Sequence, residues 1–273
     1  MKKLAARRRS PLALMVLLLL GLTMTGTAYA ALQPKADPGT SAATSSVDDI
    51  AAGEALFQAN CASCHGSNAQ GGVEADSIES PGPSLIGVGA ASVDFQVATG
   101  RMPLNAPGVQ APENRMNLKF TDEEITQLAA YVDSLGAGPA VPDEQWLDLE
   151  GADIAEGGRI FRTNCAMCHN SSGTGGALTR GKYAPSLMNV DEQHIYEAML
   201  TGPQSMPVFN DNNITPQEKE DVIAFLKDVE DGGNAYGGNS MGSLGPAGDA
   251  AFVWTLGIGL LIAAAVWLGR KAA

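Results

Sequence analysis

Basic residues are scarce in this chain of 273 residues, which holds 17 lysines and arginines against 30 aspartates and glutamates. Five of the basic residues lie within positions 1–30 and two lie at positions 270 and 271. The segment from residue 31 to residue 269 therefore contains only ten basic residues but all 30 acidic ones. Nucleic-acid binding needs basic surface that neutralises phosphates, so the composition argues against a nucleic-acid-binding protein. The acidic surface either attracts a basic partner or serves solubility alone.

Cysteine and histidine are also scarce, with four and three residues. Residues 61–65 read Cys-Ala-Ser-Cys-His and residues 165–169 read Cys-Ala-Met-Cys-His, and they hold every cysteine and two of the histidines. Cys-x-x-Cys-His is the attachment signature of c-type haem, in which two thiols form thioethers to the porphyrin and the histidine binds the iron. We therefore predict two covalently bound haems c, attached at Cys61, Cys64, Cys165 and Cys168, with His65 and His169 as axial ligands.

Other sites use paired cysteines, namely four-cysteine zinc sites, thioredoxin-like redox pairs and disulfide frameworks. A zinc ribbon needs its two pairs much closer together than the 104 residues that separate Cys61 from Cys165. A redox pair does not require a histidine directly after it, twice. The repeated motif therefore favours haem attachment.

A Met-Pro pair follows each motif at the same distance, because Met102 and Met206 each lie 37 residues after the motif histidine. A methionine thioether is a known second axial ligand of cytochromes c and raises their reduction potential. We predict His/Met ligation of both irons and a role in moving single electrons. Met116 is the rival ligand in the first copy, but the equal spacing favours Met102.

The two copies repeat a mostly helical pattern. Expected helices span about 47–60 and 153–164 before the motifs, and about 92–99 and 191–201 before the methionines. A last helix begins in each copy at a capping box, Thr121 with Glu124 and Thr215 with Glu218. The first copy holds an insertion at 103–120, which is rich in Pro and Asn and is expected to be an irregular loop.

Both ends of the chain are apolar. A basic stretch, an apolar run from Leu12 to Leu22 and the triplet 28–30 (Ala-Tyr-Ala) predict a signal peptide cleaved before Ala31, with an uncleaved anchor as the alternative. Residues 250–269 carry no charge and, at ~1.5 Å per residue, are long enough to cross a hydrocarbon core of ~30 Å. Arg270 and Lys271 follow, which predicts a cytoplasmic C-terminus and haem domains on the extracytoplasmic side of the cell membrane.

The predicted fold is all-α, with two tandem class I cytochrome c domains and one C-terminal transmembrane helix. The predicted segments are the signal peptide at 1–30, a disordered linker at 31–46, the first domain at 47–136, the second domain at 153–230, a flexible linker at 231–249 and the membrane helix at 250–269.

The combination resembles the dihaem cytochrome c subunit of the menaquinol–cytochrome c reductase (cytochrome bc complex) of Gram-positive, high-GC respiratory chains. The resemblance covers about residues 47–270. It rests on the single C-terminal span and on residues 60–66, 100–104, 164–169 and 205–207, which read Asn-Cys-Ala-Ser-Cys-His-Gly, Gly-Arg-Met-Pro-Leu, Asn-Cys-Ala-Met-Cys-His and Ser-Met-Pro.

The resemblance implies a role for several residues. His65 and His169 would be proximal ligands, and Met102 and Met206 distal ones. The carbonyls of Pro83 and Pro185 would accept a hydrogen bond from the other nitrogen of each ligating imidazole. In each domain a glycine and a phenylalanine would let the first helix pack closely on the last, namely Gly53 and Phe57 against Tyr131, and Gly157 and Phe161 against Phe225.

The resemblance also implies a function. The chain would take electrons from a Rieske iron–sulfur subunit, beside a cytochrome b subunit, and pass them to an aa-type cytochrome c oxidase. Quinol oxidation would belong to partner subunits, and the chain alone would catalyse nothing. The alternatives are the dihaem donor subunit of a haem–copper oxidase and a free-standing tethered carrier. A dihaem peroxidase needs an open iron position, which two matched methionines argue against.

The sequence also allows predictions about the surroundings of Arg101 and His194. Arg101, next to Met102, either pairs with a haem propionate or faces solvent. His194, in a polar helical stretch, is expected to be an ordinary surface histidine.

Overall fold

The structure is a computed structural model that describes residues 11–32, 46–72, 82–106, 108–114, 116, 118–232 and 250–272. The chain divides into two compact units, Met1–Thr40 and Ser41–Ala273. In the first unit, α2 (Pro11–Leu32) is an apolar helix that covers the part of the predicted signal peptide from residue 11 onward, and residues 1–10 lie outside the described residues. The 31–46 and 231–249 linkers fall mostly outside the described residues.

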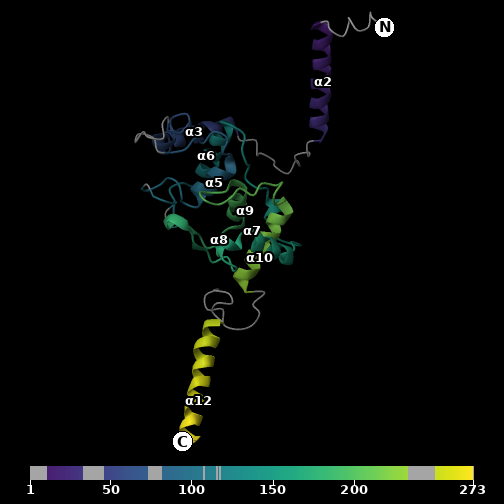
Figure 1. The fold of residues 1–273 in the computed structure, drawn as a ribbon. Coiled ribbons are helices and arrows are strands. Elements are labelled where there is room, and N and C mark those ends of the chain that lie inside the picture. Colours follow the sequence, from purple (N-terminus) through teal and green to yellow (C-terminus); the bar gives the residue numbers. More distant parts are fainter. Residues whose placement is uncertain are drawn as a thin grey trace, which may run out of the picture. The chain divides into compact units, whose positions relative to one another are not determined.

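The second unit is mostly helical, as predicted (Figure 1). The first domain contains α3 (Val47–Asn60), α4 (Ala62–His65), α5 (Ala90–Ala98) and α6 (Asp122–Ser134). The second contains α7 (Ile154–Asn164), α8 (Ala166–His169), α9 (Glu192–Thr201) and α10 (Pro216–Asp231). The expected helix bounds hold to within about two residues, which is the usual uncertainty of helix ends.

Some elements were not predicted from the sequence. A two-stranded antiparallel ribbon joins β1 (Gly176–Ala177) to β2 (Tyr183–Ala184), with the short helix η3 (Thr179–Gly181) between them. Another short helix, η2 (Glu144–Trp146), lies in the connection between the domains. The described part of 103–120 contains no α-helix or strand, in agreement with the predicted irregular loop.

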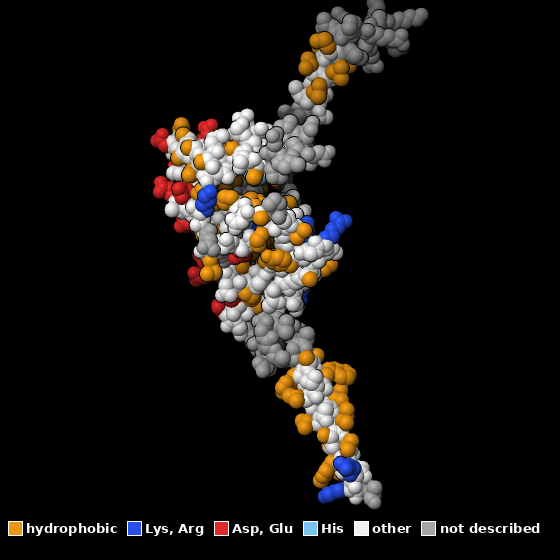
Figure 2. Space-filling view, turned by 90° about the vertical axis from the view of Figure 1, so that its left-hand side faces the viewer, with side chains coloured by type: hydrophobic (Ala, Val, Ile, Leu, Met, Phe, Trp, Pro, Cys, Tyr) orange, Lys and Arg blue, Asp and Glu red, His pale blue; other side chains and the backbone are white. Residues whose placement is uncertain are grey.

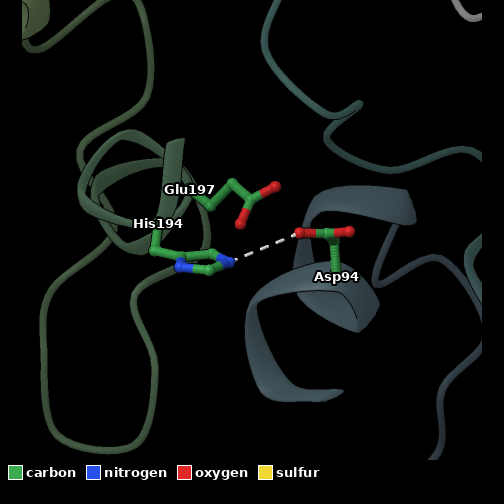
Figure 3. A group of neighbouring side chains, drawn as sticks. All are labelled: Asp94, His194 and Glu197. Carbon is green, nitrogen blue, oxygen red and sulfur yellow. Dashed lines mark ion pairs between the residues drawn. The ribbon is translucent and has the colours of Figure 1, made fainter. Parts of the chain in front are cut away.

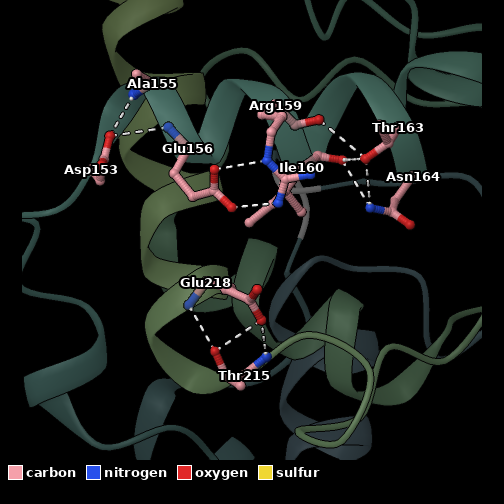
Figure 4. A network of polar contacts seen from close by, with 9 residues as sticks. All are labelled: Asp153, Ala155, Glu156, Arg159, Ile160, Thr163, Asn164, Thr215 and Glu218. Atoms are coloured by element: carbon pink, nitrogen blue, oxygen red, sulfur yellow. Dashed lines mark hydrogen bonds and ion pairs between the residues drawn. The ribbon is translucent and has the colours of Figure 1, made fainter.

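Polar side chains fix where the long helices begin. Both predicted capping boxes are present, at Thr121 with Glu124 and at Thr215 with Glu218. Asp153 caps α7 by accepting from the backbone N–H groups of Ala155 and Glu156, at 3.0 Å each (Figure 4). These contacts satisfy donors that the first turn of a helix leaves unpaired, typically worth ~1 kcal/mol each.

The first and last helices of each domain cross at a glycine. A Cβ on Gly53 would overlap the carbonyl oxygen of Gln127 in α6, and one on Gly157 would overlap that of Asp221 in α10. Beside each crossing two rings pack together. The Phe57 and Tyr131 ring centroids lie 5.2 Å apart and those of Phe161 and Phe225 lie 5.5 Å apart. The close packing expected from the resemblance is confirmed in both domains.

Each domain has its own apolar core. The first gathers around Phe57, Leu128 and Val132, and the second around Phe161, Ile223 and Leu226. Both cores include residues that adjoin a Cys-x-x-Cys-His motif, with Cys61 packed against the first and Cys165 buried in the second. The repeated fold therefore presents each motif at the edge of an apolar interior.

Near the C-terminus, a π-helical turn, η4 (Val253–Gly257), leads into α12 (Ile258–Ala272). Ala250–Lys271 forms one helix of 22 residues that is long and apolar enough to cross a membrane, and it is the one such candidate among the described residues. Figure 2 shows hydrophobic side chains along the face of this helix in view, with basic side chains at its end. The helix agrees with the span predicted at 250–269.

Candidate haem-attachment sites

The two Cys-x-x-Cys-His motifs have the same backbone conformation. The N–H of the first cysteine, Cys61 or Cys165, donates to a phenylalanine carbonyl of the preceding helix at 2.8 Å. The histidine N–H then donates back to the carbonyl of that cysteine at 2.9 Å in both domains. The first cysteines have φ and ψ of −119° and −32° at Cys61, and −115° and −36° at Cys165. The chain thus builds one turn twice.

No two of the four motif thiols form a disulfide in this structure. Burial raises the pKa of Cys61, and it raises the pKa of Cys165 to about 11 with a contribution from Cys168. These two thiols are therefore neutral near pH 7, as expected for sulfur at the edge of an apolar core.

Each motif histidine is oriented by a proline carbonyl. Nδ1 of His65 lies 2.8 Å from the carbonyl oxygen of Pro83, and Nδ1 of His169 lies 3.0 Å from that of Pro185. A carbonyl only accepts, so Nδ1 carries the proton and donates it. Nε2 keeps its lone pair for a metal. The hydrogen bonds that the resemblance implies are confirmed.

His169 is also kept neutral by its surroundings. Burial lowers the pKa of this imidazole, and the hydrogen bond to Pro185 partly opposes that effect. The neutral imidazole is the form that binds a metal ion. Both motif histidines are buried, His65 at 9% exposure and His169 at 8%.

The second domain brings its predicted site residues to one cavity. Cys165, Cys168, His169 and Met206 all line it, and its wall is largely apolar, including Phe161, Ile195, Met199, Val222 and Leu226. Paired thiols, an imidazole and a thioether around an apolar cavity fit a covalently attached porphyrin. These residues would hold a haem c here, with Met206 as the candidate distal ligand.

In the first domain, Met102 follows shortly after α5, as Met206 follows shortly after α9. Its backbone N–H donates to the carbonyl of Gln96 at 2.9 Å, which ties the methionine loop to α5. Met102 is partly buried, whereas Met116 is 94% exposed. Met116 therefore points into solvent in this structure.

Arg101 does not face solvent, and that alternative was wrong. Its side chain is 8% exposed and pairs with Glu113 at 3.3 Å. The guanidinium also lies 4.7 Å from the centre of the Phe95 ring, close enough for a cation–π contact. Arg101 and Glu113 both line the cavity of the second domain, which places them beside the second haem site.

The insertion loop, residues 103–120, is hydrogen-bonded to the second domain. Gln110 exchanges two hydrogen bonds with the backbone of Tyr183, at 2.8 and 2.9 Å. Gln204 exchanges two with the backbone of Ala111, at 3.0 and 3.1 Å. These contacts join segments at least 73 positions apart. The sequence signals only an irregular loop, because nothing local marks which distant backbone it will meet.

Sequence models of two families match the two domains. One described as cytochrome c matches residues 50–136, and one described as cytochrome c oxidase, cbb3-type, subunit III matches residues 152–226. The chain therefore contains two cytochrome c domains, which implies covalently bound haem c.

A curated protein of Corynebacterium efficiens, the cytochrome bc1 complex cytochrome c subunit, is 41% identical to this chain. The alignment covers 99% of this chain and 93% of the relative. The protein of the same name from Mycobacterium tuberculosis H37Rv is 42% identical over 94% of this chain and 90% of its own length. This chain belongs to the family of cytochrome bc1 complex cytochrome c subunits. The predicted resemblance is confirmed.

More distant relatives match only part of this family member. The cbb3-type cytochrome c oxidase subunit FixP of Sinorhizobium medicae is 31% identical over 50% of this chain and 44% of its own length. The similarity to this oxidase subunit covers half of the chain, whereas the similarity to the bc1 subunits covers 94–99% of it.

Proposed function

We propose that this cytochrome bc1 subunit binds two haems c and relays single electrons through them within a respiratory complex. The repeated attachment turn carries the proposal. Each copy places two cysteines, neither of them in a disulfide, beside an imidazole whose Nδ1–H is hydrogen-bonded to a proline carbonyl. A bound haem c supplies a reversible one-electron Fe(III)/Fe(II) couple.

We assign the ligands as follows. Cys61, Cys64, Cys165 and Cys168 hold the porphyrins. His65 and His169 supply proximal nitrogens from Nε2, and Met102 and Met206 supply the distal thioethers. The equal spacing of histidine and methionine in both copies supports this set, as does the presence of Met206 in the same cavity as His169.

The proposed electron path begins at the Rieske centre of a menaquinol-oxidising complex that also contains a cytochrome b subunit, and ends at an aa-type oxidase. Similarity to bc1 subunits along the whole chain supports membership of such a complex. A chain whose two haem domains pack on each other through α5 and α9 is suited to replace a diffusing carrier. Quinol oxidation itself belongs to the partner subunits.

The proposed topology places both haem domains on the extracytoplasmic side and the C-terminus in the cytoplasm. It is supported by the apolar helix Ala250–Lys271 and by the basic pair, Arg270 and Lys271, in its last turn. Haem domains tethered by this helix would stay beside membrane-bound donors and acceptors.

A donor subunit of a cbb3-type oxidase is the second candidate function. The match of the second domain to the cbb3-type subunit III model and the partial similarity to FixP favour it. It is the weaker candidate because its support covers half of the chain, whereas the similarity to bc1 subunits covers nearly all of it.

Purification in mild detergent through a C-terminal tag tests the proposal. We expect b-type haem, a Rieske centre and a-type haem to co-purify with the chain, together with quinol-driven oxygen uptake. Recovery of oxidase haems without b-type haem or a Rieske centre would favour the second candidate. Recovery of c-type haem alone, without quinol activity, would contradict the proposal that the chain is a bound subunit of a respiratory complex.

A further inference from the structure

A cluster of three ionisable side chains lies where the two haem domains meet. Asp94 projects from α5 of the first domain, and His194 and Glu197 project from one face of α9 in the second (Figure 3). The expectation that His194 is an ordinary surface residue was wrong, because its side chain is 16% exposed and faces Asp94. None of the three belongs to the assigned haem ligands.

The three side chains converge on one point. One ligand atom from each lies within 4.8 Å of the other two, and Nε2 of His194 is 3.8 Å from Oδ2 of Asp94. The Gln193 amide donates to Oδ2 of Asp94 at 3.0 Å and to Oε1 of Glu197 at 3.1 Å, which holds the two carboxyl groups together. The Phe95 ring meets the His194 imidazole edge-on, with centroids 6.4 Å apart, and so fixes its plane.

Glu197 gives a second, independent indication that something binds here. The residue is 0% exposed, and its buried Oε2 atom meets no donor among the described residues other than the neighbouring carboxyl group of Asp94. Figure 3 shows its carboxyl group turned towards Asp94 and His194 rather than away from them. Two carboxyl groups buried against each other are costly unless a proton or a cation joins them.

The electrostatics of the cluster also call for positive charge. Burial raises the pKa of Glu197 to about 10, and the neighbouring Asp94 raises it as well. The pKa of Asp94 is likewise raised, first by burial. Two carboxyl groups this close cannot both ionise cheaply unless a cation joins them.

We propose that Asp94, His194 and Glu197 form a binding site for a divalent transition cation, of which Zn²⁺ is the best fit. One imidazole nitrogen and two carboxylate oxygens are ligands that Zn²⁺ accepts, and they leave its fourth position to water. Ca²⁺ and Mg²⁺ prefer all-oxygen sites, so the histidine selects against them. At Zn–N and Zn–O distances of ~2.0–2.2 Å, the ligand atoms must approach to ~3.4 Å of one another, which side-chain rotations supply.

The site would tie the two haem domains together. Asp94 comes from one domain and the other two ligands from the next, so the cation bridges α5 and α9. Ligands separated by 100 positions in sequence are brought together only when the domains are docked, so cation binding stabilises the docked state. The bound cation would thereby fix the position of one haem domain relative to the other.

Zinc titration of the full-length haem-loaded protein in detergent tests the site. The protein carries a tag without histidine and is first stripped with a chelator. We expect calorimetry against a competing chelator to give one tight equivalent of Zn²⁺ per chain. Asp94→Asn, His194→Gln and Glu197→Gln should each weaken binding ~100-fold or more, because each removes a direct ligand. The control variant Glu123→Gln, exposed in the first turn of α6, should bind as wild type does.

Two readouts separate a metal site from a folding effect. Unchanged haem spectra and circular dichroism would show that the variants are folded, and Zn²⁺ should raise the Tm of wild type but not of His194→Gln. X-ray absorption at the zinc edge of the wild type needs no variant, and we expect one nitrogen and two carboxylate oxygens among the ligands. The proposal would be overturned if the protein failed to bind Zn²⁺, if His194→Gln bound it as tightly as wild type, or if the ligand shell contained no nitrogen. A proton shared between the carboxyl groups of Asp94 and Glu197 would then be what holds the cluster together.

Discussion

The imidazoles of His65 and His169 are each fixed by one hydrogen bond to a proline carbonyl, at 2.8 and 3.0 Å. Such a bond sets the tautomer, the ring plane and the basicity of the nitrogen that binds the metal. The two proline carbonyls come from loops 16 to 18 residues downstream of the histidines. The orientation of each proposed ligand histidine therefore depends on a backbone atom, which no side-chain substitution removes.

The methionines allow a sharper test. We expect Met102→Ala to convert one of the two haems to a high-spin or lower-potential form, because the iron loses a thioether that favours the reduced state. Absorption and electron paramagnetic resonance spectra of the purified protein, with a redox titration, would measure the change.

Met116→Ala is the matched control, because this methionine is 94% exposed and should leave both haems low-spin. If Met116→Ala changed a haem and Met102→Ala did not, the assignment of Met102 would be wrong.

The helices show how the sequence builds one domain twice. In both copies a capping box starts the last helix and a glycine on the first helix allows the two backbones to touch. Beside the crossing, two aromatic rings pack against each other in each domain. Because the first helix leads directly into the attachment turn, the packing of these helices positions the cysteines.

The glycine crossing gives a stability prediction. Gly157→Ala adds a methyl group that overlaps the backbone of Asp221, and overpacking of this kind costs typically ~1–3 kcal/mol. The gain of up to ~1 kcal/mol from the better helix propensity of alanine offsets only part of that. We expect a Tm lower by roughly 5–10 °C for the second domain in calorimetry.

Gly53→Ala should act in the same way on the first domain, since its methyl group would meet Gln127. Ala55→Ser, exposed on the same helix α3, is the control and should shift the Tm little. An unchanged Tm in both glycine variants would mean that the helices do not cross as closely as the structure has them.

The assembled chain combines two haem domains with apolar segments at both ends. α5 packs on α9, the 103–120 loop clasps the second domain, and Asp94 meets His194 and Glu197 at the junction. The described residues thus join the two haem domains through polar contacts, some of which border the cavity of the second site.

Truncation tests which apolar segment anchors the protein. A chain ending at Gly232 lacks the helix Ala250–Lys271, and we expect its haem domains to appear in the soluble extracytoplasmic fraction. Intact mass spectrometry should place the mature N-terminus at Ala31. Retention of this variant in the membrane, with residues 1–30 still attached, would instead identify α2 as a second anchor.

The sequence by itself determined the haem motifs, the repeat, the helices and the apolar C-terminal segment. Each of these depends on residues close together in the chain, where spacing and periodicity are sufficient evidence. The equal 37-residue spacing of histidine and methionine is also the basis for predicting Met102, and not Met116, as the ligand in the first domain.

Only the tertiary structure decided which residues of the two haem domains contact each other. Arg101 and Glu113 border the second haem site although they belong to the first domain, and Asp94 lies 3.8 Å from His194 across 100 positions of sequence. A contact of this kind leaves no periodic or local signal, because it depends on how two finished domains dock. The physical reason is that attachment chemistry is local in the chain, whereas the environment between the haem sites is created by packing.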